Sequence, residues 1–175
     1  MKKVICVTGD RSGVGKSTAA KIFAEVLDGE IISLAEPIKV IAYQMGWAGE
    51  KDAKGRKLLQ TLGTECGRNL ISKDIWLNKW FKEVREAESD VVICDDVRFQ
   101  NEYDFVSANT ECVFFHIVTG KPSLLEKWWR NLSAHESEKG YVADSSVVKI
   151  ENFGSLKEFE ATVYNMARNQ ARYWK

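Results

Sequence analysis

Short apolar runs alternate along this chain with longer segments in which apolar side chains recur every three or four residues. The short runs are typical of buried strands, and the longer segments are typical of amphipathic helices. Five runs are expected to be strands: 4–7, 30–33, 91–94, 112–118 and 147–150. Because strands that alternate with helices usually pair in parallel, the pattern predicts an α/β fold: a mostly parallel five-stranded sheet with helices on both faces.

The segments of helical period predict six helices. The first, 16–27, has one apolar face and is followed by Asp28-Gly29, a common helix C-terminus. The second, 36–46, begins with Glu36-Pro37, and proline favours early helical positions. The remaining predicted helices are 54–70, 74–88, 99–108 and 155–174.

The first predicted strand leads through a Gly-rich turn into a helix, which is the arrangement of a phosphate-binding P-loop. Backbone N–H groups of such a turn point at phosphate oxygens, and the dipole of the following helix favours the anion. We expect Lys16 to bridge the β- and γ-phosphates of ATP and Ser17 to place its hydroxyl on Mg²⁺. The predicted ATP-binding residues are Gly9, Asp10, Arg11, Ser12, Gly13, Val14, Gly15, Lys16, Ser17 and Thr18.

The spacing of this loop departs from the usual pattern at one position. The first glycine of G-x-x-x-x-G-K-[ST] would fall at Asp10, and Gly9 stands one residue earlier. Either the loop is one residue longer, or Asp10 takes the turn conformation, which Asp adopts more readily than most residues. Phosphate binding is expected in both cases.

The third predicted strand delivers two carboxylates to the edge of the sheet where an α/β fold builds its site. We favour Asp95 as the partner of Mg²⁺, through a metal-bound water, with Asp96 as the alternative or as a base. The competing interpretation is an Asx turn that only ends the strand. Arg98 either neutralises these carboxylates or contacts the transferred phosphoryl group.

Two connections are longer than a simple crossover requires: 34–90, and the polar, basic stretch 119–146. In a phosphoryl-transfer enzyme the first would hold the acceptor and the second would close over the phosphates as a lid. The sequence therefore predicts one P-loop domain over 1–175, a three-layer sandwich with a helical acceptor-binding insertion and a lid region.

Charged side chains of the first insertion could bind the phosphate of an acceptor, and its amide and aromatic side chains could bind the base. A solvated helix face explains any single one of these residues equally well. Trp76 offers a flat surface for a base. In the second insertion, Arg130 is favoured over His135, because phosphoryl transfer depends on charge neutralisation more than on acid–base catalysis. His116 lies in an apolar run and is interpreted as a core residue.

The composition argues against a nucleic-acid-binding protein, a C-x-x-C metal or redox protein and a membrane-spanning protein. Lys plus Arg and Asp plus Glu number 25 each, so the net charge is zero and no overall positive field attracts nucleic acid. The four cysteines have no C-x-x-C spacing, and no apolar stretch is long enough to span a bilayer. We expect a soluble cytoplasmic protein whose partners are nucleotides, with no membrane and no nucleic acid polymer. The oligomeric state, a homodimer included, stays open.

Five segments that follow the P-loop in order together resemble the phage-type deoxynucleoside monophosphate kinases: 34–47, 55–76, 95–102, 135–138 and 151–159. They contain the set LQ-x-LG-x-x-x-GR, DD-x-RF-x-NE and H-x-SE. The resemblance implies transfer of the γ-phosphoryl group from ATP, with Mg²⁺, to a deoxynucleoside monophosphate. If the gene is phage-encoded, the protein would act in the host cytoplasm.

The resemblance also implies which residues surround each substrate. Acceptor-binding residues would be Glu36, Lys39, Gln60, Arg68, Trp76, Asp96 and Arg98. Together with Asp95, which is taken from its position after the third predicted strand, the predicted catalytic residues are Lys16, Asp95, Arg98 and Arg130, and the predicted metal ligands are Ser17 and Asp95. Glu36 stands where the family pattern more often has Asp before Pro, a difference that bears on sugar recognition.

Two other functions keep the same ATP site. A P-loop kinase for another small acceptor, such as dephospho-coenzyme A, would differ only in the insertions. A nucleotide-switch or DNA-partitioning ATPase would hydrolyse ATP slowly without an acceptor. Such ATPases carry a signature Lys where this chain has Arg11, which counts against that reading.

Overall fold

A computed structural model describes the chain except at residues 10, 12, 51, 121–146 and 175. The chain forms two compact units. One comprises Met1–Ile31 and Ala87–Lys175 and is called the P-loop unit below; the other, Ile32–Glu86, is called the helical unit. None of the described helices is long and apolar enough to cross a membrane.

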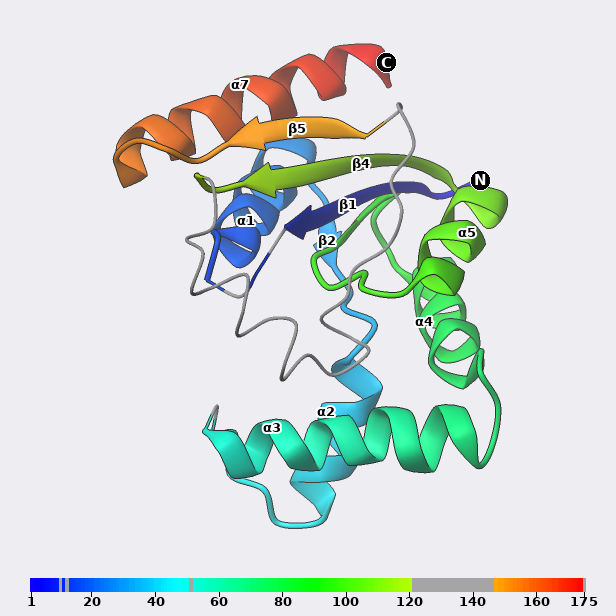
Figure 1. Ribbon diagram of the computed structural model, residues 1–175. Helices are drawn as coiled ribbons and strands as arrows, with labels where there is room; N and C mark the ends of the chain where they lie inside the picture. The colour runs from blue at the N-terminus through cyan, green and yellow to red at the C-terminus, as the bar shows by residue number, and fades with distance from the viewer. Residues whose placement is uncertain (10, 12, 51, 121–146, 175) are drawn as a thin grey trace. The chain divides into compact units, whose positions relative to one another are not determined.

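The P-loop unit is built on a five-stranded sheet in which every neighbouring pair of strands is parallel. The spatial order is β2 (Glu30–Ile31), β3 (Val91–Cys94), β1 (Lys3–Gly9), β4 (Glu111–Val118) and β5 (Val148–Glu151). Figure 1 shows β1, β4 and β5 as neighbouring arrows that point the same way. The predicted sheet is confirmed, although β2 is shorter than the predicted 30–33.

Helices cover both faces of this sheet. Successive residues of a strand point to opposite faces. Ile5 and Val7 lie in one core with α1 (Lys16–Leu27) and α7 (Leu156–Tyr173), which contribute Phe23 and Phe159. On the other face, the ring of Tyr103 from α5 (Gln100–Asn109) lies 4.4 Å from that of Phe114. The predicted helices on both faces are therefore confirmed.

The end of α1 shows how local chemistry sets a boundary. The helix spans the predicted residues Lys16–Leu27. Asp28 then takes a left-handed conformation with φ 51°, and the N–H of Gly29 donates to the carbonyl of Ala24 at 2.8 Å. Asp28 is therefore the left-handed residue at this helix end, and Asp is one of the few residue types that adopt this conformation at modest cost.

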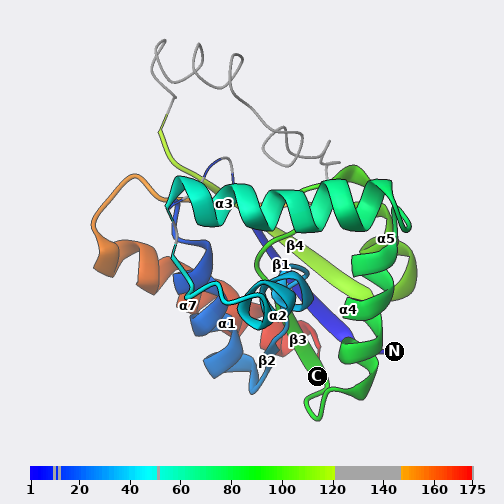
Figure 2. The same cartoon turned by 90° about the horizontal axis from the view of Figure 1, so that it is seen from below.

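The helical unit contains α2 (Glu36–Gln44), α3 (Ala53–Gln60), the π-helix η1 (Thr61–Asn69) and α4 (Ile75–Glu86). Figure 2 shows α3 continuing into η1 as one long ribbon. The prediction of a single α-helix over 54–70 is therefore wrong in its second half. The π segment surrounds a tertiary contact: the indole N–H of Trp76 donates to the carbonyl of Gly63 at 2.7 Å, and Trp76 is only 4% exposed.

Gly67 is expected to be required for this contact. A Cβ at Gly67 would lie 2.5 to 2.7 Å from three atoms of the Trp76 ring. Gly67→Ala should therefore destabilise the protein by about 1–3 kcal/mol through overpacking, even though helix propensity alone favours Ala by about 1 kcal/mol. Urea unfolding would measure this, with the exposed neighbour Cys66→Ala as control. Equal midpoints for the two variants would show that Trp76 is not fixed against the π-helix.

Candidate active site

The turn between β1 and α1 has the backbone expected of a phosphate-binding loop. Gly13 and Gly15 adopt φ values of +80° and +104°, which favour glycine strongly over other residues. Gly15 is the N-cap of α1 and, having no side chain, provides no acceptor for the first-turn N–H groups. A helix N-terminus of this kind attracts anions. The geometry of the turn therefore suits the phosphates of a nucleotide.

The loop is held from one side by the segment that joins β5 to α7 and by the first turn of α7. The side-chain amide of Asn152 donates to the carbonyl of Val14 at 3.0 Å. The Phe159 ring lies so near Gly15 that an added Cβ would be 2.8 Å from its Cε1. Val14 itself is buried in the core shared by α1 and α7. Sequence reasoning missed Asn152 and Phe159 as supports of the loop, although both lie in the 151–159 segment that carried the family resemblance.

This packing makes Gly15 more sensitive to substitution than Gly13. Gly15→Ala adds both backbone strain and a clash with Phe159, whereas a Cβ at Gly13 meets nothing within 4 Å. We expect Gly15→Ala to weaken binding of a nonhydrolysable Mg-ATP analogue by about tenfold or more, since each left-handed residue with a Cβ costs roughly 1–2 kcal/mol before any clash. Gly13→Ala, measured by the same calorimetric titration, should weaken it less. The reverse order would contradict the packing described here.

Ser17 and Asp95 come together at the carboxyl ends of neighbouring strands. Cys6 of β1 lies opposite Cys94 of β3, so both strands end at the same edge of the sheet. There the hydroxyl of Ser17 donates to Oδ2 of Asp95 at 3.1 Å. The ammonium of Lys16 donates to the carbonyl of Arg11 at 3.0 Å, within the same loop. A hydroxyl, a carboxylate and a lysine are thus assembled at the start of α1.

Asp96 makes a different contact from Asp95. The thiol of Cys94 donates to Oδ1 of Asp96 at 3.5 Å. Burial, and then the charge of Asp96, raise the pKa of Cys94 well above its usual value, so this thiol stays protonated and can donate. Of the two adjacent carboxylates, Asp95 is the one that meets the P-loop serine.

Arg98 is exposed beside these carboxylates. In the part of the chain that the structure describes, no ion pair joins its guanidinium to Asp95 or Asp96. Its backbone N–H donates to a carboxylate oxygen of Glu102 at 2.6 Å. The arrangement therefore gives no support to the idea that Arg98 only neutralises its neighbours.

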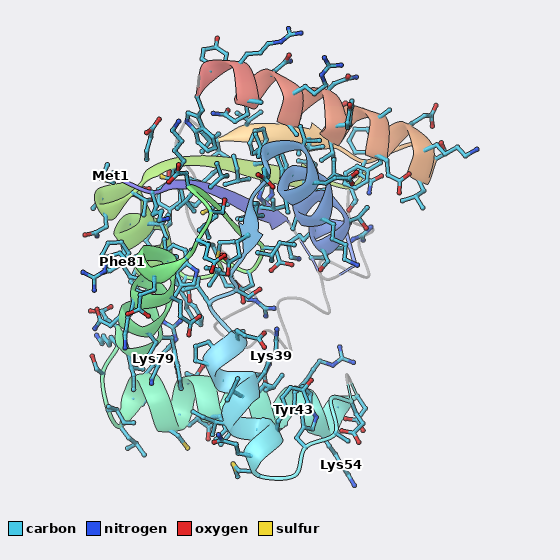
Figure 3. The ribbon with its side chains drawn as sticks, turned by 180° about the vertical axis from the view of Figure 1, so that it is seen from behind. Met1, Lys39, Tyr43, Lys54, Lys79 and Phe81 are labelled. Carbon is cyan, nitrogen blue, oxygen red and sulfur yellow. The ribbon has the colours of Figure 1, made fainter. Side chains whose placement is uncertain are left out.

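The helical unit contains five of the predicted acceptor-binding residues. Lys39 and Glu36 form an ion pair of 2.9 Å on α2, where Figure 3 labels Lys39 and Tyr43 one turn apart. Gln60 is the last residue of α3, and Arg68 lies in η1. Both are partly buried.

Trp76 does not offer the accessible flat surface that was predicted to bind a base. Its 4% exposure and its contacts with Gly63 and Gly67 give it a packing role in the helical unit. Asp10, Ser12 and Arg130, and residues 121–146 of the predicted lid, fall outside the described residues.

The residues at the sheet edge fit a magnesium ion that is shared with a nucleotide. Among the described residues, no three His, Cys, Asp or Glu side chains cluster to hold a metal on their own. The Ser17 hydroxyl and the Asp95 carboxylate are oxygen ligands of the type that Mg²⁺ prefers, and Mg²⁺ commonly completes its shell with water and substrate phosphates. The donor set is therefore consistent with a metal that arrives with a triphosphate.

The family model for deoxynucleotide monophosphate kinase matches residues 44–163 of this chain. The chain belongs to the deoxynucleotide monophosphate kinase family. The matched stretch begins after the P-loop, so the geometry of the β1–α1 turn is an observation independent of that match. The family resemblance expected from the sequence is confirmed.

The chain is also similar to the deoxynucleoside-5'-monophosphate kinase of Escherichia phage T5. It is 30% identical over 118 residues, which cover 63% of this chain and 44% of that protein. This member of the deoxynucleotide monophosphate kinase family thus aligns with less than half the length of its relative.

Solved structures of small-molecule kinases share the fold. Shikimate kinase from Bacteroides thetaiotaomicron matches with a TM-score of 0.56 and 16% identity, over 97% of this chain and 98% of that one. Dephospho-CoA kinase from Campylobacter jejuni matches with a TM-score of 0.51 and 18% identity, over 100% of both chains. At such identities the likeness concerns the fold alone, and the predicted fold class, a parallel five-stranded α/β sheet with helices on both faces, is confirmed.

Proposed function

We propose that this protein transfers the γ-phosphoryl group of ATP to a deoxynucleoside monophosphate, yielding ADP and the deoxynucleoside diphosphate. The observation that carries the proposal is the contact between Ser17 and Asp95 at the start of α1, in a chain of this family. A hydroxyl and a carboxylate at that position are what a P-loop kinase requires to hold a metal-bound triphosphate.

The reaction requires positioning more than acid–base chemistry. A phosphate oxygen of the acceptor is already anionic near neutral pH, so it can attack the γ-phosphorus in line without a strong base. Lys16 and the loop N–H groups would hold the β- and γ-phosphates, and Arg98 would contact the transferred group. Ser17 and Asp95 would hold Mg²⁺, Asp95 through water. The metal, when bound, neutralises phosphate charge during transfer.

In this proposal the acceptor nucleotide binds to the helical unit. Lys39 and Arg68 supply positive charge for its phosphate, and Gln60 supplies an amide for its base. Glu36 forms an ion pair with Lys39 on the same helix. Trp76 supports the π-helix that carries Arg68 instead of stacking on the base. A lid over 119–146 that contributes Arg130 remains a prediction.

The test is a coupled assay of ADP release with Mg-ATP and a panel of deoxy- and ribonucleoside monophosphates. Dephospho-coenzyme A and a reaction without acceptor serve as controls. Strong stimulation by one or more deoxynucleotides is expected. Stimulation by dephospho-coenzyme A alone would transfer the assignment to that acceptor, and slow hydrolysis that no acceptor stimulates would favour a nucleotide-switch ATPase.

A further inference from the structure

Glu102 in the first turn of α5 is buried, with 3% of its surface exposed. Among the described residues it is the only buried side chain that carries a formal charge. Its Oε2 accepts two hydrogen bonds from consecutive backbone N–H groups, from Arg98 at 2.6 Å and from Phe99 at 3.0 Å. Burying a carboxylate is costly unless such charge-assisted bonds compensate for it.

Capping of α5 alone does not explain this arrangement. In a complete capping box the N-cap side chain accepts a bond in return, but the N-cap residue here is Phe99, whose ring has no acceptor. The other capping box in the described chain, between Ser155 and Glu158 of α7, is reciprocal and lies on the surface. An exposed Ser or Asp at the N-cap would cap α5 without burying a charge. The carboxylate of Glu102 also binds one N–H beyond that of the N-cap residue, the backbone N–H of Arg98.

The two bonds fix the short segment that joins β3 to α5. This segment begins with Asp95, which contacts Ser17, and it includes Arg98, whose backbone is bound by Glu102. The guanidinium of Arg98 remains exposed and makes no ion pair among the described residues. Because its backbone is fixed and its guanidinium makes no ion pair among the described residues, Arg98 is preorganised to bind an anion.

We propose that Glu102 is a positioning residue that holds the backbone at Arg98 and so aims its guanidinium at the transferred phosphoryl group. This inference rests on the proposed kinase function. Glu102 touches no substrate; it acts through Arg98. Glu102 is the last residue of the motif DD-x-RF-x-NE, and the sequence pattern alone did not predict this role for it.

The test compares four variants with the wild type in the coupled assay, at a temperature where all are folded. Glu102→Ala removes both bonds, whereas Glu102→Gln keeps an oxygen that can accept them. Val106→Ala, a buried position on the same helix, is the control for destabilisation of α5. Arg98→Ala is made in the wild type and in the Glu102→Ala background. If Glu102→Ala does not fold, Glu102→Asp, which keeps the charge but is too short to reach, takes its place.

We expect Glu102→Ala to lower kcat about 10- to 100-fold, because small displacements of a contacting group have effects of that size. The KM for ATP should change little. Glu102→Gln should recover most of kcat, and Val106→Ala should lower stability without this loss of kcat. Arg98→Ala should cost much less in the Glu102→Ala background than in the wild type, as expected of two residues that act as one unit.

Two results would overturn the inference separately from the proposed function. If the wild type phosphorylates its acceptor but Glu102→Ala behaves like Val106→Ala, Glu102 serves stability alone. If the effects of Arg98→Ala and Glu102→Ala simply multiply, Glu102 does not act through Arg98. A wild type that no acceptor stimulates would instead remove the proposed function, and the inference with it.

Discussion

Replacing Lys16 by Ala should reduce phosphoryl transfer by roughly 10³-fold while the protein remains folded. The lysine lies in the first turn of α1 and its ammonium is held within the P-loop by the carbonyl of Arg11. Removing one preorganised cation or donor from the transferring phosphate typically costs about 10²- to 10³-fold in kcat. Steady-state turnover with saturating acceptor would measure the loss, and circular dichroism would report on the fold.

Lys21 provides the matched control for this substitution. It lies on the same helix, is exposed, and belongs to no predicted site. Lys21→Ala removes the same charge and should leave turnover near that of the wild type. Full activity of Lys16→Ala would refute the assignment of the P-loop as the ATP site.

Replacing Asp95 by Asn is expected to lower turnover about 10²-fold at low Mg²⁺ and to shift the activating Mg²⁺ concentration upward. The amide is neutral, so it attracts the metal and its bound water less than the carboxylate does. The contact with the Ser17 hydroxyl at 3.1 Å can persist, because the amide oxygen still accepts a hydrogen bond. A Mg²⁺ titration of kcat at fixed ATP separates this effect from a loss of folding.

The adjacent Asp96→Asn distinguishes the two carboxylates. Asp96 accepts a hydrogen bond from the Cys94 thiol, whereas the Ser17 hydroxyl donates to Asp95. Its substitution should leave the Mg²⁺ dependence unchanged, whatever it does to acceptor binding. If only Asp96→Asn shifts the Mg²⁺ requirement, the metal role belongs to Asp96.

Features encoded over short stretches of sequence could be predicted. The boundaries of α1 and β3 agree with the predicted 16–27 and 91–94, because a Gly-rich turn and a compact apolar run mark them clearly. The P-loop required only the order of strand, glycines, lysine and serine. Asp95 could be placed near it because parallel strands end at one edge of the sheet.

Features that depend on distant contacts could not be predicted. The π-helix lies around an indole from α4, and the helical period of 54–70 carries no sign of that partner. The support of Val14 by Asn152 joins residues 138 positions apart. The difference between Asp95 and Asp96 depends on which way two neighbouring side chains turn, and sequence spacing does not record this.

The contacts that Asn152 and Phe159 make with the P-loop bear on the order of events during synthesis. During synthesis the phosphate loop leaves the ribosome before the residues that support it, because Asn152 lies 138 positions after Val14. We expect nascent chains that stop short of residue 152 to hold nucleotide poorly, even with the complete motif exposed. Competence to bind ATP would then arise only once Asn152 and Phe159 have been synthesised and packed against the loop, so a shorter nascent chain would not sequester nucleotide before it can use it.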